Sequence, residues 1–396
     1  MPPSGEEKPY RVYRGGRVKG GVPTLAREQR TRAMDRDGQR RLRRGAEPPE
    51  RGHVTPRKRW YRRWSWKRWL VVGVASLFTL VLIWGIASWF SFRSGVVAAN
   101  DRLPKRVKAA LVQQDGLLLS HPSNILLLGT DSAKSRPGNR HSDSIMLVHT
   151  DPDHHRIVYL SLMRDLRVEV PGYGTQKINA AYQFGGPRLA IKTIRQFTGI
   201  PINHIALVDF AQFRKLIDEL GGVTVDVPKK IRSNKFDCPF KTQAQCDQWQ
   251  GWRFAKGSQN MNGQRALIYS RIRENLLDPS ESDATRAARQ QQVIQAIGNK
   301  LTGFWTLVQM PFIGGDLVRP IATDLSAGQL VQLGWVKFRG NALRCRLGGT
   351  ADGTGYIIPD EESRAVIAMM LGKSAAQPPL PHSLYGSGCV SGKSSL

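Results

Sequence analysis

The longest apolar stretch of the chain runs from Leu70 to Phe92 and contains no charged residue. A helix of these 23 residues extends about 34 Å, slightly more than the roughly 30 Å hydrocarbon core of a bilayer. A buried helix of a soluble domain usually keeps one polar face, and a cleaved signal peptide is shorter and lies at the N-terminus. The pattern therefore predicts a single transmembrane helix over residues 70–92.

Beyond residue 123, short apolar runs alternate with amphipathic segments, which is typical of an α/β fold. Between residues 305 and 372 we expect a strand, a helix and a strand, with the helix over 323–336 capped by Asp324 or Ser326. The pattern predicts strands at 124–130, 144–151, 156–162, 204–210 and 223–227, and helices at 187–198, 211–220, 262–272 and 284–304.

Composition divides the remainder of the chain. Residues 1–69 form a basic tail, rich in Arg, Gly and Pro, that we expect to be disordered because it offers little apolar surface to bury. Residues 93–122 are expected to form an amphipathic stalk, and residues 123–373 are long enough for one folded domain. Residues 374–396 are rich in Pro, Ser and Gly and predict an irregular tail.

Charge predicts the orientation of the span. Residues 1–69 carry 21 Lys and Arg against 7 Asp and Glu, a net +14, which is half of the +28 of the whole chain. The positive-inside rule places this tail in the cytoplasm and the C-terminal domain outside, at the plasma membrane. Trp60, Trp64, Trp66 and Trp69 before the span and Trp89 near its end are typical interfacial anchors. The tail is expected to bind anionic membrane lipids, and no specific nucleic-acid binding is expected.

All four cysteines follow the span, on the side predicted to be oxidising. Cys238 and Cys246 flank a polar loop that a disulfide would close, the alternative being two free thiols. Cys345 and Cys389 are a second candidate pair. A zinc site is not expected, because no histidine lies near the loop in the sequence.

Carboxylates stand at the ends of two predicted strands. Asp131 follows the first strand and Asp143 precedes the second, so the two converge if these strands are neighbours. Paired carboxylates of this kind are ordinary ligands of Mg²⁺, which also takes phosphate oxygens. The alternative is a pair of solvated loop and turn residues. No G-x-S-x-G, P-loop or H-E-x-x-H pattern points to another chemistry.

Arginines recur at the ends of predicted elements. Arg164 is followed by Asp165, Arg271 and Arg273 lie two apart, and Arg286 and Arg289 lie on one face of a helix followed by Gln290. The planar guanidinium suits phosphate oxygens, so arginines that converge from several elements would form a pyrophosphate site. The alternative for each arginine is a surface ion pair.

The order of the motifs resembles one known family. NILLLGTDS, SDSIMLVHTD, SLMRDLRVEVPGYGTQKINAAYQFGG, DFAQFRKLIDELGGVTVDVP, GQRALIYSRIRE and DATRAARQQQVIQAI follow one another over residues 123–300. This series resembles the LytR–CpsA–Psr family of cell-envelope proteins. The resemblance implies an α-β-α sandwich with a central mixed β-sheet, and a phosphotransferase that moves a glycopolymer from a polyprenyl-pyrophosphate carrier onto peptidoglycan.

The resemblance also implies roles for individual residues. Asp131 and Asp143 would hold Mg²⁺, Asp165 would orient Arg164, and Asn179 would support the wall of the site. The pyrophosphate would be held by Arg164, Arg271, Arg273, Arg286 and Gln290, with Arg289 and Arg140 as further candidates. In the family an arginine usually precedes the second aspartate by two residues; here His141 takes that position and Arg140 lies one residue further away.

Three alternatives to transfer remain, one of which is a lipid-binding scaffold with no turnover. A hydrolase of the lipid carrier would use the same site with water as the acceptor. A membrane regulator would sense a ligand without turnover, although no helix-turn-helix pattern occurs in residues 1–69.

Overall fold

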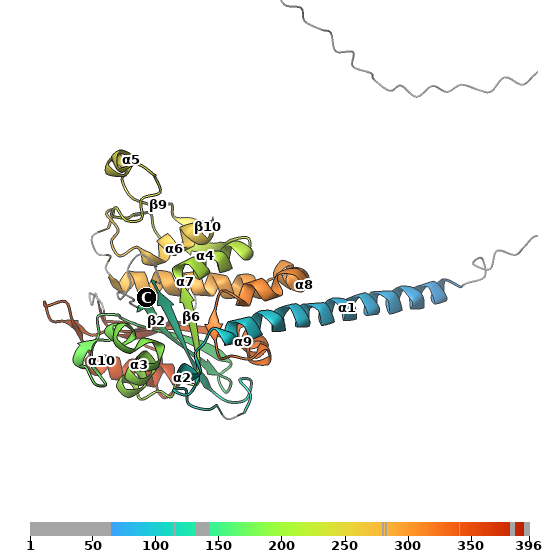
Figure 1. Ribbon diagram of the computed structural model, residues 1–396, viewed down its shortest axis with the longest axis horizontal. Coiled ribbons are helices and arrows are strands. Elements are labelled where there is room, and N and C mark those ends of the chain that lie inside the picture. Colours follow the sequence, from blue (N-terminus) through green and yellow to red (C-terminus); the bar gives the residue numbers. More distant parts are fainter. Residues whose placement is uncertain are drawn as a thin grey trace, which may run out of the picture. The chain divides into compact units, whose positions relative to one another are not determined.

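A seven-stranded mixed sheet forms the centre of the computed structural model, with the strand order β11-β6-β1-β2-β3-β12-β15 (Figure 1). The structure describes residues 65–114, 116–131, 142–278, 281, 283–339, 341–380 and 385–391. The strands are β1 (Ser123–Thr130), β2 (Ser142–Asp151), β3 (Arg156–Leu162), β6 (His204–Asp209), β11 (Ala322–Thr323), β12 (Asn341–Leu347) and β15 (Gly388–Ser391).

The strand ends meet at one edge of this sheet. β1 pairs parallel with β6, β3 pairs parallel with β12, and β2 lies antiparallel between β1 and β3. The C-terminal ends of four strands and the beginning of β2 therefore lie together, and we call this the site edge. The middle parts of the central strands are apolar on both sides because helices cover both faces of the sheet.

One face of the sheet is covered by α3 (Ala180–Thr198) and α10 (Glu361–Met370) (Figure 1). Leu126, Leu147 and Leu160 point to this face and are buried in the same cluster as Ile191 of α3. α3 begins earlier than the sequence predicts: Gly186, at φ 63°, breaks it, and its second part begins at Pro187. This left-handed backbone is one that glycine adopts without strain.

The opposite face carries more helices. They are α4 (Phe210–Glu219), α6 (Gly263–Arg271), α7 (Asp283–Leu301) and α9 (Ala327–Arg339). α4, α6 and α7 pack around the strand pair β7 (Val223–Val227) and β10 (Gly257–Met261), and together they bury a second apolar cluster that includes Ile217, Val225 and Ile268. The predicted strand 223–227 is thus present but lies outside the central sheet.

The shorter elements complete the description: α2 (Lys105–Lys108), β4 (Arg167–Val170), β5 (Gly174–Lys177), β8 (Ile231–Arg232), α5 (Gln243–Gln248), β9 (Arg253–Phe254), β13 (Thr350–Ala351) and β14 (Ile357–Ile358). At the start of α9 the backbone N–H of Gln329 donates to Ser326 Oγ (3.2 Å), whereas Asp324 instead accepts from the N–H of Ile205. Of the two expected caps, Ser326 is the one used.

The apolar segment at residues 70–92 lies in one long helix, α1 (Trp66–Asp101). Within the described ranges, α1 is the one helix long and apolar enough to cross a membrane. Its second half, from Trp84 onward, is packed against α8 (Phe304–Val318), the helix that follows α7. The strand, helix and strand expected between residues 305 and 372 are present as β11, α9 and β12, whereas α8 was not predicted.

Two features differ from the predicted division of the chain. Residues 93–101 continue α1, and Leu103 and Val107 are buried in the domain, so residues 93–122 are not a separate stalk. The predicted irregular tail contains β15, which pairs with β12. The basic tail, apart from its last residues, lies outside the described residues, as do Arg140 and His141.

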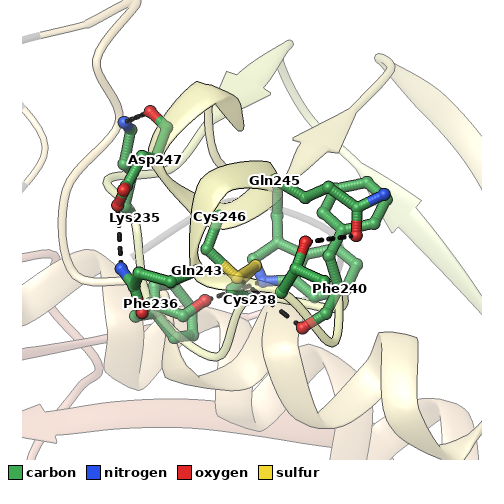
Figure 2. The surroundings of a disulfide bond; sticks show 10 residues. Lys235, Phe236, Cys238, Phe240, Gln243, Gln245, Cys246 and Asp247 are labelled. Carbon is green, nitrogen blue, oxygen red and sulfur yellow. Dashed lines mark hydrogen bonds between the residues drawn. A yellow bond between two sulfur atoms is a disulfide. The ribbon is translucent and has the colours of Figure 1, made fainter.

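Both expected cysteine pairs are disulfides. Cys345 and Cys389 join β12 to β15 and are buried. Cys238 and Cys246 close the loop that holds α5, and Figure 2 shows the Nζ of Lys235 donating to the backbone carbonyl of Asp247 (2.6 Å) beside that bond.

Candidate active site

The site edge is irregular where β1 meets β2. Gly129 pairs with Ser144 and Thr130 pairs with Ser142, so Asp143 is the extra residue of a β-bulge. Such bulges bend a strand and redirect a side chain, often beside an active site. Asp131 follows directly at the end of β1. The backbone thus brings the two predicted carboxylate residues to adjacent strands at one edge, as the sequence indicates.

Arg164 lies just beyond the C-terminal end of β3, next to the strand that carries Asp143. Its Nε donates to Asp165 Oδ2 (3.1 Å), and the Nζ of Lys177 donates to Asp165 Oδ1 (2.9 Å). Burial acts to raise the pKa of Asp165, but the hydrogen bond from Lys177 and the charge of Arg164 outweigh it and hold that pKa below its ordinary value. Asp165 is therefore an anion that fixes Arg164, which is the contact the resemblance implies.

Asn179 precedes α3, and its backbone N–H donates to the carbonyl of Arg164 (3.3 Å). Its side chain makes no capping bond. The residue therefore supports the segment that carries Arg164.

A cavity of about 420 Å³ opens between the sheet and the second helical layer, next to the site edge. Its depth is apolar because β1, β6, α4 and α7 all present aliphatic or aromatic side chains to it. The apolar lining residues include Leu127, Val208, Phe213, Leu216, Leu267, Val293, Ile294, Ile297 and Ile321. Pockets with a largely apolar lining and a few convergent polar groups are typical ligand sites.

Cationic side chains gather on this cavity. Arg271, Arg273 and Arg286 line it, together with Gln290. Gln290 is held in place from two sides: Ser144 Oγ donates to its Oε1 (2.9 Å) and its Nε2 donates to the carbonyl of Ser270 (3.5 Å). The predicted arginines at the end of α6, just after α6 and on α7 thus lie at one cavity.

Arg271 is the best defined of these arginines. Its guanidinium lies over the ring of Phe210 (4.7 Å to the centroid) and near that of Phe236 (5.7 Å), and it forms an ion pair with Asp237. Aromatic faces attract and orient a guanidinium. Two aromatic rings and one carboxylate therefore fix the guanidinium of Arg271 beside the cavity.

Arg289 has different surroundings from Arg286. It does not line the cavity; it is buried, pairs with Glu281, and donates from Nη1 to the carbonyl of Ile272 (2.8 Å). These bonds tie α7 to the segment after α6. We therefore leave Arg289 out of the proposed binding set.

The donors at the site edge suit Mg²⁺ bound together with a phosphate ligand. Mg²⁺ is often held by one or two carboxylates and completes its shell with water and phosphate oxygens. Among the described side chains, which do not include that of Asp143, no group of three or more His, Cys, Asp or Glu is arranged to hold a metal. A cation between Asp131 and Asp143 would therefore depend on the substrate for its remaining ligands.

Several residues of the site escape sequence reasoning. Phe210, Phe236 and Asp237 contact Arg271 from α4 and from the disulfide-closed loop, both distant in the sequence. Asp237 adopts a φ of 48°, uncommon for a non-glycine residue, directly before Cys238. Trp252 Nε1 donates to the carbonyl of Phe236 (3.0 Å) and helps fix this loop. The one available signal was the pair of cysteines around CPFKTQAQC, which marked a structured loop but not its contacts.

The described residues thus join one long apolar helix to a domain that holds a largely apolar cavity lined by three arginines. The LytR_cpsA_psr family model matches residues 87–342, so the chain belongs to this family. Curated relatives include the Staphylococcus aureus protein named regulatory protein MsrR, 36% identical over 250 residues, which are 62% of this chain and 68% of the relative.

A second relative carries an enzyme name. It is the Bacillus cereus polyisoprenyl-teichoic acid–peptidoglycan teichoic acid transferase TagU, 28% identical over 272 residues, which cover 67% of this chain and 83% of the relative. Both the predicted family and the expected class of enzyme, a transferase, are therefore confirmed.

Solved structures support the fold. TagT bound to LI-WTA matches with a TM-score of 0.50 and 23% identity, over 65% of this chain and 94% of TagT. A LytR-Csp2A-Psr enzyme from Actinomyces oris matches with a TM-score of 0.50 and 22% identity, over 66% and 94%. The predicted fold, a central mixed sheet flanked by helices, is confirmed.

Proposed function

We propose that this protein transfers a glycopolymer from a polyprenyl-pyrophosphate carrier to cell-wall peptidoglycan, forming a phosphodiester. The observation that carries the proposal is the composition of the cavity, apolar in depth and cationic around Arg271, Arg273 and Arg286. A prenyl chain matches the apolar part, and a pyrophosphate matches the arginines. The transferase name of the TagU relative supports the same reaction.

The arginines bind and neutralise the pyrophosphate. Each guanidinium offers a fork of N–H donors that fits two phosphate oxygens, and such charge-assisted bonds strengthen where water is excluded. Arg271 is oriented by Phe210 and Phe236, so little reorganisation is needed when Asp237 is exchanged for phosphate. Asp165 keeps Arg164 directed toward the site edge.

The reaction is a displacement at phosphorus. A sugar hydroxyl of peptidoglycan attacks the phosphorus that bears the glycan; the new O–P bond forms as the P–O bond to polyprenyl phosphate breaks, and the hydroxyl proton passes to a carboxylate or to solvent. Negative charge grows on the equatorial and leaving oxygens, where preorganised arginines stabilise it. Mg²⁺ held by Asp131 and Asp143 would supply further charge neutralisation.

The location follows from the helix and its flanks. We propose that α1 crosses the plasma membrane once with the basic residues 1–69 in the cytoplasm and the domain outside. The apolar tail of the carrier lies in that same bilayer. Anchoring confines enzyme and carrier to one surface, which raises their effective concentration.

The test is a reconstitution of the full chain in liposomes with a polyprenyl-pyrophosphate glycan, Mg²⁺ and peptidoglycan. Transfer predicts glycan covalently bound to peptidoglycan and polyprenyl phosphate in the lipid fraction. Release of free phospho-glycan would instead identify a hydrolase. An intact carrier under conditions in which it binds would support a sensor, a role that the name of the MsrR relative favours.

A further inference from the structure

The outer side of α8 is apolar and uncovered. Phe304, Trp305 and Phe312 are 71%, 70% and 82% exposed, and no charged residue occurs from Phe304 through Gly315. Monomeric soluble proteins rarely expose a contiguous apolar patch of this kind unless it contacts another surface. We therefore expect the exposed aromatic residues of α8 to contact an apolar environment.

The remainder of α8 faces the protein. Thr306, Gly315 and Leu317 are buried, and Met310 and Ile313 pack against the second apolar cluster. α8 is thus already anchored to its own domain by one side. Its outer side contributes nothing to the described core and is available to a partner.

α8 runs parallel to the end of the membrane helix. Trp84 Nε1 donates to the carbonyl of Val308 (3.0 Å), and further along Ser91 Oγ accepts from the N–H of Gly315 (3.2 Å). A Cβ atom added to Gly95 would collide with the backbone of Gly315. The backbones of the two helices are therefore in contact at the glycines. The helices diverge toward Trp84, where the Trp84 side chain reaches across the space between them. Figure 1 shows α8 beside this end of α1.

Both helices change from apolar to polar at the same level. The apolar run of α1 ends at Phe92, whose backbone lies next to Gly314. The first charged residue on α8 after that point is Asp316, and Arg102 of α1 then donates to the carbonyl of Arg319. The exposed aromatic residues of α8 lie before this boundary, alongside the apolar part of α1.

We infer that the outer side of α8 is inserted in the outer leaflet of the bilayer that α1 crosses, so that the domain contacts the membrane through two helices. The occupant of this surface is lipid hydrocarbon, because the patch is continuous with the exposed apolar belt of α1 and ends at the same polar level. The apolar lining of the cavity includes Leu216 of α4, Ile297 of α7 and Ile321, which lies three residues after the end of α8.

The inference rests on the proposed location of α1 but not on transfer activity, and spin labels test it without an activity readout. The four native cysteines are paired, so one introduced cysteine is the single thiol. Full-length Phe312→Cys would be labelled with a nitroxide in liposomes, with Phe304→Cys as a second site in case the first variant does not fold. Relaxation by O₂, which concentrates in hydrocarbon, is compared with relaxation by a water-soluble nickel chelate.

Two control positions make the result decisive. The first control is Phe78→Cys, on the exposed apolar part of α1. The second is Leu380→Cys: Leu380 is also apolar and exposed, but it precedes β15, which lies at the opposite edge of the sheet from β11. We expect the O₂-to-nickel ratio at Phe312 to resemble that at Phe78 and to exceed that at Leu380 about tenfold, since O₂ partitions into hydrocarbon. Equal ratios at Phe312 and Leu380, with Phe78 in lipid, would overturn the inference. A water-exposed Phe78 would instead refute the span itself.

Discussion

Leu126 and Leu127 are neighbours on β1, point to opposite faces of the sheet, and meet different surroundings. Leu126 is fully buried among the side chains under α3, whereas Leu127 is partly buried and lines the cavity. The face that carries Leu126, which we call the closed face, is filled by the helices that rest directly on it. The face that carries Leu127, the open face, is packed by α9 and α7 around Ile125 and Met146 but leaves the cavity beside Leu127.

The difference arises from what the covering layer contains. α4, α6 and α7 bury their own cluster around β7 and β10, so they do not need the sheet to complete their core. α7 also packs on the sheet through Ile294, and the cavity lies between β1, β6, α4 and α7. Binding space on the open face thus depends on packing behind it.

The largest effect on activity is expected from removing a positive charge at the cavity over the open face. Arg271→Ala should lower transfer about 10³-fold, because preorganised cations supply much of the stabilisation in phosphoryl transfer. Thermal unfolding should change little. Arg265→Ala is the matched control: Arg265 lies on the same helix, over the ring of Phe254 (4.3 Å), but does not line the cavity. Full activity of a folded Arg271→Ala protein would refute the arginine site.

The same substitution at the two leucines tests the comparison of the faces directly. Leu126→Ala should lower the free energy of unfolding by about 3 kcal/mol through the cavity it creates. Leu127→Ala should cost less, about 1 kcal/mol, but should raise KM several-fold for a long-chain prenyl carrier. The measurements are urea unfolding in detergent and steady-state kinetics with long and short prenyl chains. Equal stability losses with unchanged KM would contradict the distinction between the faces.

Acid should weaken the closed face through His149, which shares that face of β2 with Leu147. Burial lowers the pKa of His149 from 6.5 to about 4. Between these values the unfolded histidine binds a proton that the folded one does not, so the free energy of unfolding falls as pH drops from 6.5 to 4, by up to about 3 kcal/mol. His149→Gln should flatten this part of the profile, although it also alters the 2.8 Å contact with Asn124. An unchanged slope would exclude His149 as the cause.

The smallest effect is expected at the rim of the cavity. Asp237 pairs with Arg271 and competes with an anionic ligand for it. Asp237→Asn should therefore lower KM for the carrier about threefold, with a stability change under about 1 kcal/mol because the pair is partly exposed. Asp247→Asn is the control: Asp247 lies just after Cys246, as Asp237 lies just before Cys238, and it accepts from Gln243 Nε2 (Figure 2). A higher KM for Asp237→Asn would mean that the pair orients Arg271 productively.

Local patterns predicted much of the fold. The central strands are apolar runs limited by polar residues, so NILLLGT and RIVYLSL were found almost at their observed bounds. The same patterns do not encode pairing, and therefore β7 was found as a strand but its place outside the central sheet was not. The helix over residues 305–318 was not predicted, for another reason: an almost wholly apolar helix has no polar face, so its sequence shows no helical period.

The site was predictable where its residues follow strand ends. Asp131 and Arg164 were located because strand termini meet at one sheet edge, and Arg164 was correctly paired with Asp165. Arg286 and Arg289 show the limit of the method. They lie one helical turn apart on α7, yet Arg286 lines the cavity and Arg289 pairs with Glu281, because the segment after α6 folds back over one of them. The spacing of the two arginines along the helix does not by itself predict that tertiary contact.

The contact between Gly95 and Gly315 has a consequence for how the protein adapts to membranes of different thickness. Because α1 is fixed to α8 from Trp84 onward, one residue inserted between Trp84 and Gly95 would rotate the rest of the helix by about 100° and break this register. The half of the proposed span that packs against α8 is thus set by the fold of the domain. Hydrophobic mismatch must be absorbed in the half between Trp66 and Ile83, by tilt or by changes of length there. Related chains in thicker or thinner bilayers should vary in that half alone.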